Sequence, residues 1–284
     1  MKHITQIEKH IENRSIFITG GASGLGLAIA SEFAKAGWRV GIFDLNQEHI
    51  ESAQKQLQCE RTSPIFFQGN VANYAELKAC IDDFAADGLG VMINNAGIAA
   101  GGNFLERTLD DWNKIYQINV FGVVNGCKAA LPHLIGNRAI LHNVASAAGF
   151  MSSPMMASYN SSKAAVVSLT ETLIGEYSMT DSLLISVSLP AFFKTNLLAS
   201  LLASDEEKEA ARLLMKYSDY TVEQAVEDIL EGIANKQNYI FAPKKLRTLW
   251  RFKRFLPNQF IKVLPEKRRK RIELLKAQER DQKS

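Results

Sequence analysis

The chain has 284 residues, of which 46% are hydrophobic and 22% charged, and its formal net charge is +3. This composition is ordinary for a globular protein and excludes a collagen-like, fibrous or wholly disordered chain. No apolar run approaches the ~18 residues of a transmembrane helix, and residues 1–14 lack the apolar stretch of a secretory signal. The three cysteines and five histidines predict neither a disulfide framework nor a metal site. We therefore expect a cytoplasmic protein with reduced thiols.

The charge is unevenly distributed along the chain. Residues 244–284 contain 15 Lys or Arg and 4 Asp or Glu, a net charge of +11, so residues 1–243 carry −8. An acidic body with a basic tail indicates either two separate roles or one role at an anionic surface.

Short β-rich apolar runs alternate with longer amphipathic segments along the body. Strands are expected at 15–19, 39–43, 64–67, 89–94, 139–144, 183–189 and 238–241, the first six of them buried. Helices are expected at 24–36, 46–57, 73–86, 108–134, 157–178 and 222–236. This alternation predicts βαβ units with right-handed crossovers. We therefore expect an α/β Rossmann fold, a doubly wound seven-stranded parallel sheet covered on both faces.

Three segments complete the expected organisation. Residues 1–14 form a lead-in to a single Rossmann domain at 15–242. Within that domain, residues 191–221 form a connection of the length typical of a substrate loop. Residues 243–284 form a basic, amphipathic helical extension, in which Pro257 is expected to end a first helix.

A glycine-rich turn follows the first strand directly. Gly20, Gly24 and Gly26 fit the pattern TGxxxGxG, in which glycines let the backbone turn tightly and approach a pyrophosphate. The helix that follows offers free N–H groups and the positive end of its dipole. Because a strand precedes the turn and a helix follows it, the pattern predicts a dinucleotide site rather than a mere tight turn.

The second strand ends at Asp44, which bears on the choice of cofactor. A carboxylate there can accept hydrogen bonds from the ribose hydroxyls and repels a 2′-phosphate, which favours NAD over NADP without excluding NADP. Ser23 offers no positive charge to a 2′-phosphate, and Arg39 lies at the far end of the strand. The alternative role of Asp44 is to cap the next helix, and it could serve both roles.

Polar residues follow the fifth strand. Ser146 lies at its carboxyl end, where ligands bind in sheets of this kind. Further along, Tyr159 and Lys163 are four residues apart at the start of a predicted helix. Positions i and i+4 share a helix face, so both side chains can point into one cleft.

In these motifs the sequence resembles the short-chain dehydrogenase/reductase family. The resemblance covers roughly residues 12–242 and rests on the order and spacing of TGGASGLG at 19–26, Asn94-Asn95-Ala96-Gly97, Asn119, Ser146, Tyr159, Lys163, Pro190 and Thr195. It implies an NAD(P)-dependent oxidoreductase that transfers a hydride. Its implied cofactor contacts are Gly20, Ser23, Gly24, Leu25, Gly26, Asp44, Asn70, Val71, Asn95, Ala96, Gly97, Tyr159, Lys163, Pro190 and Thr195.

The resemblance also implies catalytic roles. Tyr159 would be the acid/base catalyst, and the Ser146 hydroxyl would orient the substrate oxygen. Lys163 would bind the nicotinamide ribose, and Asn119 would hold a water that links Lys163 to solvent. A free tyrosine has a pKa of about 10. Because the Lys163 ammonium and the positive nicotinamide ring both favour the phenolate, we expect the pKa of Tyr159 to be lowered toward neutrality.

Two positions depart from the family pattern. Asn70 stands where an acidic residue is usual, although an amide can still donate to and accept from an adenine. Ala191 stands where glycine usually follows the proline, and its methyl group could reshape the loop beside the nicotinamide.

The expected substrate pocket is apolar, which favours a lipophilic secondary alcohol or ketone. Each wall residue could instead belong to the core. A 3-oxoacyl-thioester reductase of lipid metabolism and a non-catalytic, nucleotide-sensing binding protein remain alternatives. A sugar-nucleotide epimerase would instead require GxxGxxG and a larger C-terminal domain. The candidate wall residues are Ile98, Phe104, Phe150, Met155, Met156, Phe192, Phe193, Leu197 and Leu198.

The extension places aromatic and aliphatic residues at helical spacing among its cations. Such a pattern suits an anionic membrane surface, here through residues 244–276. A helix packed on the domain or on another copy explains the pattern equally well, and nucleic acid is the least favoured partner. The family resemblance implies a homodimer or homotetramer, formed through the helices near 108–134 and 157–178.

Overall fold

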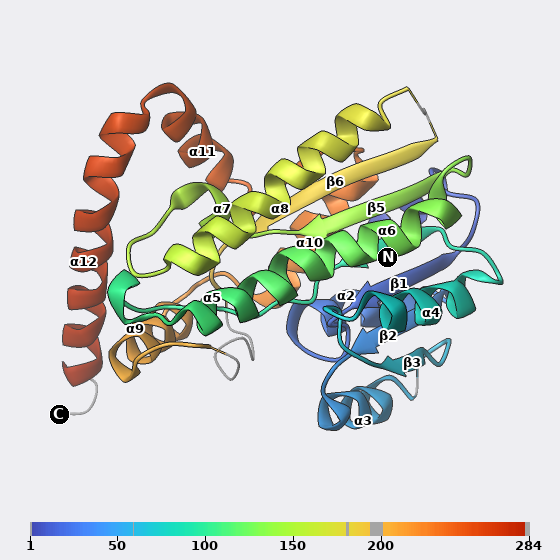
Figure 1. Ribbon diagram of the computed structural model, residues 1–284, viewed down its shortest axis with the longest axis horizontal. Coiled ribbons are helices and arrows are strands. Elements are labelled where there is room, and N and C mark those ends of the chain that lie inside the picture. The colour runs from blue at the N-terminus through green and yellow to red at the C-terminus, as the bar shows by residue number, and fades with distance from the viewer. Residues whose placement is uncertain (1, 59, 180–181, 194–200, 282–284) are drawn as a thin grey trace.

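The computed structural model describes residues 2–58, 60–179, 182–193 and 201–281. Their strands form one parallel sheet in the order β3-β2-β1-β4-β5-β6-β7, which confirms the predicted doubly wound fold (Figure 1). The order reverses between β1 and β4, so a crevice is expected at the carboxyl ends of these two strands. The strands are β1 (Ser15–Thr19), β2 (Arg39–Asp44), β3 (Ile65–Gln68), β4 (Val91–Asn94), β5 (Ala139–Val144), β6 (Leu183–Pro190) and β7 (Tyr239–Ala242).

Helices cover both faces of the sheet. One apolar core lies under α1, α2, α3 and α10, and the other lies under α4, α6 and α8, of which α6 and α8 cross in front of the sheet in Figure 1. The helices of the body are α1 (Lys2–Glu8), α2 (Gly24–Lys35), α3 (Gln47–Leu57), α4 (Tyr74–Ala85), α5 (Leu109–Tyr116), α6 (Gly122–Leu134), α7 (Ala148–Met151), α8 (Ala157–Glu176), α9 (Asp205–Lys216) and α10 (Val222–Ala234).

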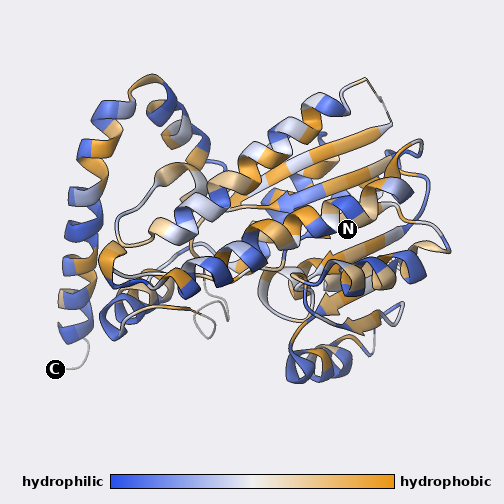
Figure 2. Ribbon diagram, in the orientation of Figure 1, coloured by the Kyte–Doolittle hydropathy of each residue, from blue (hydrophilic) through white to orange (hydrophobic). Residues whose placement is uncertain are grey.

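The sheet is more apolar than the helices around it, as Figure 2 shows. β1, β4 and β5 are buried along their whole length, because each has a neighbour on both sides and helices on both faces. β3 differs from the buried strand expected at 64–67, since it is an edge strand and Ile65 is 43% exposed. Within the lead-in, α1 buries Ile4 and Ile7 in the core beside α10.

The segment expected as one helix at 108–134 is divided. A π-helical turn, η2 (Gln117–Phe121), separates α5 from α6, and Asn119 is fully buried within it. A short 3₁₀ turn, η1 (Phe104–Glu106), precedes α5. The long connection after β6 contains α9, which begins at the N-cap Ser204.

The extension forms two helices, α11 (Leu246–Phe255) and α12 (Pro257–Asp281), so Pro257 ends one helix and begins the next. α11 packs against β7 and α7, whereas α12 packs against α9 (Figure 1). Glu279 of α12 pairs with Arg212 at 2.5 Å and with Lys216 at 2.7 Å, and these cations lower its pKa to about 2. Nowhere in the described ranges does a helix reach the length and apolarity needed to cross a bilayer.

Candidate active site

The glycine turn after β1 forms a cradle that side chains would fill. Gly20 and Gly24 have φ of +61° and +52°, in the left-handed region that glycine adopts without strain. A Cβ atom on Gly26 would lie 2.2 Å from the carbonyl oxygen of Gly20. Ser23 is the N-cap of α2, yet its side chain makes no capping hydrogen bond. The open turn and the uncapped helix N-terminus fit a bound pyrophosphate.

Asp44 ends β2 beside this cradle. Its side chain is mostly buried and accepts hydrogen bonds from the backbone N–H groups of Ala22 and Asn46, each at 3.1 Å. Asn46 rather than Asp44 caps α3, so the capping alternative for Asp44 is wrong. The carboxylate therefore stabilises the glycine turn through Ala22. It also lies where the ribose hydroxyls of a dinucleotide are expected.

The segment after β4 is tied to the same turn. Asn95 donates from Nδ2 to the carbonyl oxygens of Thr19 at 3.0 Å and of Gly20 at 2.9 Å. In return, the Thr19 hydroxyl accepts from the backbone N–H groups of Asn95 and Ala96, each at 3.1 Å. The structure thus adds Thr19 to the residues that shape the cofactor cleft, which its place in TGxxxGxG could have indicated.

Asn70 and Val71 follow β3. The Asn70 side chain accepts from the N–H of Ala72 at 2.9 Å, and its own N–H donates to Glu76 at 3.0 Å. The loop is therefore ordered by local hydrogen bonds without the usual acidic residue. Val71 is buried against Gly122 of α6.

Asn119 lies in the π turn and joins two elements of the site. Its Oδ1 accepts from the N–H of Ile98 at 2.8 Å, and its Nδ2 donates to the carbonyl of Ile98 at 2.9 Å and to Ser162 at 3.2 Å. The amide therefore holds the segment after β4 against α8. A Cβ atom on Gly97 would lie 3.1 Å from Asn119 Oδ1 and 3.3 Å from Lys163 Nζ, so these groups meet at Gly97.

Ser146, Tyr159 and Lys163 come together behind the carboxyl end of β5. All three side chains are buried, and Ser146 lies close enough to the Tyr159 phenol to influence its pKa. Lys163 donates to the carbonyl oxygen of Val144 at 3.0 Å. The Ser146 hydroxyl accepts from the N–H of Ala148 at 3.1 Å and donates to Pro190 at 3.4 Å. One strand end and one helix therefore position a phenol, a hydroxyl and an amine in a single cleft.

The pKa of Tyr159 in the protein alone reflects its burial. Burial raises it above the ordinary phenol value, and the nearby Ser146 hydroxyl offsets only part of that rise. Lys163 is itself desolvated, which lowers its pKa to about 8. In the protein alone burial therefore outweighs these groups, whereas the expected lowering of the Tyr159 pKa includes the positive charge of a bound nicotinamide ring and stays a prediction.

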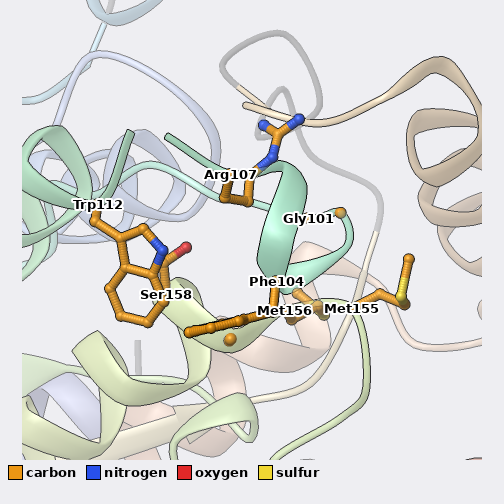
Figure 3. Close-up of a pocket in the computed structure, with 9 residues that line it drawn as sticks. Gly101, Phe104, Arg107, Trp112, Met155, Met156 and Ser158 are labelled. Atoms are coloured by element: carbon orange, nitrogen blue, oxygen red, sulfur yellow. The ribbon is translucent and has the colours of Figure 1, made fainter. Parts of the chain in front are cut away.

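A small, shallow pocket with both apolar and polar lining residues lies beside the start of α8 (Figure 3). Phe104 and Trp112 form one side with ring centroids 5.9 Å apart, and Met155 and Met156 form another. Ile98 and Phe192 pack on the apolar cluster that contains Tyr159. Of the expected wall residues, Phe104, Met155 and Met156 therefore line this pocket, and Ile98 and Phe192 lie on the cluster around Tyr159.

Other predicted wall residues lie elsewhere. Phe150 packs against Phe241 and α11, and Phe193 packs against Tyr220 in the core under α10, which agrees with the core alternative for these two residues. Both are large apolar residues close in sequence to the site, so the sequence pattern does not distinguish a place in the pocket wall from a place in the core. Thr195, Leu197 and Leu198 lie outside the described residues.

Comparison with known proteins agrees with this geometry. The sequence model of the short chain dehydrogenase family matches residues 14–206. The 2-(S)-hydroxypropyl-CoM dehydrogenase 3 of Xanthobacter autotrophicus is 32% identical over 215 residues, which are 74% of this chain and 84% of that protein. A 3-oxoacyl-[acyl-carrier-protein] reductase of Staphylococcus aureus is 28% identical over 200 residues, which are 69% and 80% of the two chains.

A solved structure extends the comparison to three dimensions. The short chain dehydrogenase/reductase of Burkholderia phymatum, determined in complex with NAD, superposes with a TM-score of 0.80 at 26% identity. The match covers 90% of this chain and 96% of that one. The family model, the relatives and the fold agree, and the chain belongs to the short-chain dehydrogenase/reductase family, as an enzyme that acts on CH–OH groups with a nicotinamide cofactor.

Proposed function

We propose that this protein interconverts a lipophilic secondary alcohol and its ketone, with NAD preferred over NADP. The observation that carries the proposal is the buried trio of Ser146, Tyr159 and Lys163, set beside an open glycine turn that ends next to Asp44. Asp44 supports NAD because its carboxylate would repel a 2′-phosphate.

Each residue of the trio has a proposed role. Tyr159 exchanges the proton of the substrate hydroxyl, and Ser146 holds the substrate oxygen and stabilises its developing charge. Lys163 binds the ribose and supplies a positive charge behind the phenol. When bound, the cofactor supplies the hydride donor or acceptor and, in its oxidised form, a positive charge near the phenol. Burial raises the pKa of Tyr159, so the phenol holds its proton in the protein alone, and the positive charges of Lys163 and of a bound oxidised cofactor would favour its release.

Further residues complete the proposed cofactor site. Gly20, Ser23, Gly24, Leu25 and Gly26 would hold the pyrophosphate at the N-terminus of α2. The remaining contacts would come from residues at the carboxyl ends of the other strands, namely Asn70, Val71, Asn95, Ala96, Gly97 and Pro190. Thr195, which lies outside the described residues, is proposed as a further contact from the sequence alone. Asn119 would connect Lys163 with solvent through a water.

The substrate class follows from the pocket wall. Phe104, Trp112, Met155 and Met156 offer apolar, adaptable surface with Arg107 as the charged lining residue. A 3-oxoacyl thioester is the alternative substrate, favoured by the similarity to the Staphylococcus aureus reductase. Turnover of a thioester with NADP as the better cofactor would select that alternative.

The test measures reduction of the cofactor by secondary alcohols of increasing chain length, with NAD and NADP in parallel. The Tyr159→Phe variant is expected to lose turnover and to retain cofactor binding, because only the hydroxyl is removed. Tyr74→Phe is the matched control, since Tyr74 is partly exposed on α4. Normal turnover of Tyr159→Phe would refute the catalytic assignment, and nucleotide binding without turnover of any alcohol or ketone would indicate a sensing protein.

Three further proposals concern organisation. A Rossmann domain at 15–242 carries the chemistry, with a lead-in at 1–14, a substrate loop at 191–221 and an extension at 243–284. Two or four copies associate through α5, α6 and α8. The enzyme resides in the cytoplasm, in keeping with the free thiols of Cys80 and Cys127.

We also propose that residues 244–276 contact an anionic membrane surface. The corner between α11 and α12 exposes Phe255 (81%), Leu256 (46%) and Ile261 (61%), as the apolar colour at this corner in Figure 2 illustrates. Arg251 and Lys262 flank them and form no ion pair with any described residue. Exposed apolar residues between cations favour a bilayer with anionic headgroups, each cation contributing about 1 kcal/mol.

Vesicles test this surface directly. The protein is expected to sediment with vesicles of phosphatidylcholine and phosphatidylglycerol, less so as salt is added, and not with phosphatidylcholine alone. A Phe255→Ser, Leu256→Ser double variant is expected to lose binding. Leu105→Ser is the control, because Leu105 is 88% exposed on η1 outside the extension. Unchanged binding of the double variant would contradict the assignment.

A further inference from the structure

The extension contacts the elements that hold Ser146. Ala147, Phe150, Leu189 and Phe241 form a buried apolar cluster, and Leu246, Leu249 and Trp250 of α11 pack against it. Ala147 follows Ser146 directly, and Leu189 precedes Pro190. α11 therefore supports the backbone on both sides of the proposed substrate-oxygen site.

The orientation of Ser146 depends on this backbone. The N–H of Ala147 donates to the carbonyl oxygen of Pro190 at 2.9 Å, which joins the start of α7 to the end of β6. The N–H of Ala148, the first residue of α7, donates to Ser146 Oγ at 3.1 Å. A shift of α7 would therefore turn the Ser146 hydroxyl directly.

α7 is too short to be stable without help at its ends. It has four residues and ends at Ser152, a non-glycine residue with φ of +56°. The last carbonyl groups of a helix lack intrahelical partners and attract cations. Lys253 of α11 meets this need, because its Nζ donates to the carbonyl oxygen of Phe150 and, at 3.1 Å, to Ser152 Oγ.

The Lys253 side chain is partly withdrawn from solvent. It is half-buried, and its Nζ lies 5.8 Å from the ring centroid of the buried Phe260 of α12. Two acceptors and a neighbouring ring therefore hold the cation that caps α7.

We propose that Lys253 is a positioning residue of the reaction: from the extension, its ammonium group caps α7 and thereby holds the Ser146 hydroxyl toward the substrate oxygen. The inference rests on the proposed role of Ser146. It makes the basic extension a part of the active-site scaffold, independent of any contact with a membrane.

The experiment compares Lys253→Met with Lys253→Arg and with Lys55→Met. Methionine keeps the apolar stem and removes the cation, arginine keeps a cationic donor, and Lys55 is an exposed lysine of α3 that lies outside the extension and the proposed site. We expect Lys253→Met to lower kcat for a secondary alcohol about tenfold, or about 1.4 kcal/mol in activation free energy. KM and the Kd of NADH are expected to change less than about twofold, because Ser146 acts mainly on the transition state.

Further outcomes discriminate between a specific effect on the position of Ser146 and a general destabilisation of the protein. Lys253→Arg is expected to restore most of kcat, and Lys55→Met to match the unaltered enzyme. In a Ser146→Ala background, Lys253→Met should cause little further loss, since the two act through one hydroxyl. Unchanged kcat in Lys253→Met, no rescue by arginine, or a parallel weakening of NADH binding would overturn the proposal.

Two results remain informative if the first variant is unstable or the proposed function fails. Should Lys253→Met not fold, Ser152→Ala removes one of the two acceptors of Lys253, and a smaller loss of kcat is expected. No loss in Ser152→Ala would then count against the proposal. Normal kcat in Ser146→Ala alone would refute the proposed role of Ser146, whereas failure confined to the Lys253 variants would refute only the positioning role.

Discussion

Substitution of Gly126 by alanine tests how tightly the two central strands are joined to α6. Asn94 at the end of β4 donates from Nδ2 to Asn143 of β5 at 2.9 Å. Its Oδ1 is buried and has no hydrogen-bond partner among the described residues. A Cβ atom on Gly126 would lie 1.8 Å from this oxygen and 2.8 Å from the Asn94 Cγ. Since 1.8 Å is far inside van der Waals contact, Asn94 or α6 must move.

The expected cost has two sources. Overpacking of a core costs about 1–3 kcal/mol. Turning Asn94 away also leaves Asn143 Oδ1 with only the weaker Cys127 thiol as donor, at about 1–3 kcal/mol for a lost buried hydrogen bond. We therefore expect Gly126→Ala to lower the free energy of unfolding by about 2–6 kcal/mol. At about 2–4 °C per kcal/mol in chains of comparable size, Tm should fall by about 4–24 °C.

Gly175 in α8 provides the matched control. A Cβ atom at this position would have no neighbouring atom within 4 Å among the described residues, so alanine brings only its better helix propensity. We expect Gly175→Ala to raise the free energy of unfolding by up to about 1 kcal/mol. Urea unfolding followed by circular dichroism measures both variants. Equal stability of Gly126→Ala and the unaltered protein, or destabilisation by Gly175→Ala, would refute the reasoning.

Two other predictions concern buried polar side chains. His142 lies between the hydroxyls of Ser186 and Ser188, and burial lowers its pKa to about 3, so the unfolded chain takes up a proton before the folded protein does. Its contribution to the free energy of unfolding should be complete above about pH 6.5 and fall by about 1.4 kcal/mol per pH unit between pH 6.5 and 3. Urea unfolding at several pH values should show that the free energy of unfolding changes less steeply with pH in His142→Gln. An identical dependence on pH would contradict this. Asp44→Ala should weaken NAD binding and raise the ratio of the Kd of NAD to that of NADP at least about tenfold, as measured by titration, because a charged hydrogen-bond acceptor is lost and the repulsion of a 2′-phosphate disappears. An unchanged ratio would exclude Asp44 as the selector.

The strands and the glycine turn could be predicted because their signals are local. Ser15–Thr19 is an apolar run bounded by polar residues, and the glycines behind it have a conformational requirement that no other residue meets. The exposure of β3 could not be predicted in the same way. An apolar run such as 64–67 does not show whether it has one neighbouring strand or two, because the order of strands is decided by long-range pairing.

The site shows the same division between local and distant causes. Spacing alone placed Tyr159 and Lys163 on one face of α8. The position of Asn119 in a π turn could not be predicted, because its side chain is bound to the backbone of Ile98, 21 residues away. The rise in the pKa of Tyr159 likewise depends on burial by several segments together. Lys253 showed no signal at all, since its partners lie about a hundred positions earlier in the chain.

The contacts of α12 have a practical consequence for exchanging segments between relatives. Arg212, Lys216 and Glu207 of α9 find their counterions in Glu279 and Arg268, near the far end of the chain. Replacement of residues 191–221 by a loop from a relative, made to alter the substrate range, would remove these α9 residues. Glu279 and Arg268 of α12 would then lose their ion-pair partners. Chimaeras of this enzyme should therefore exchange the loop and the C-terminal helix together.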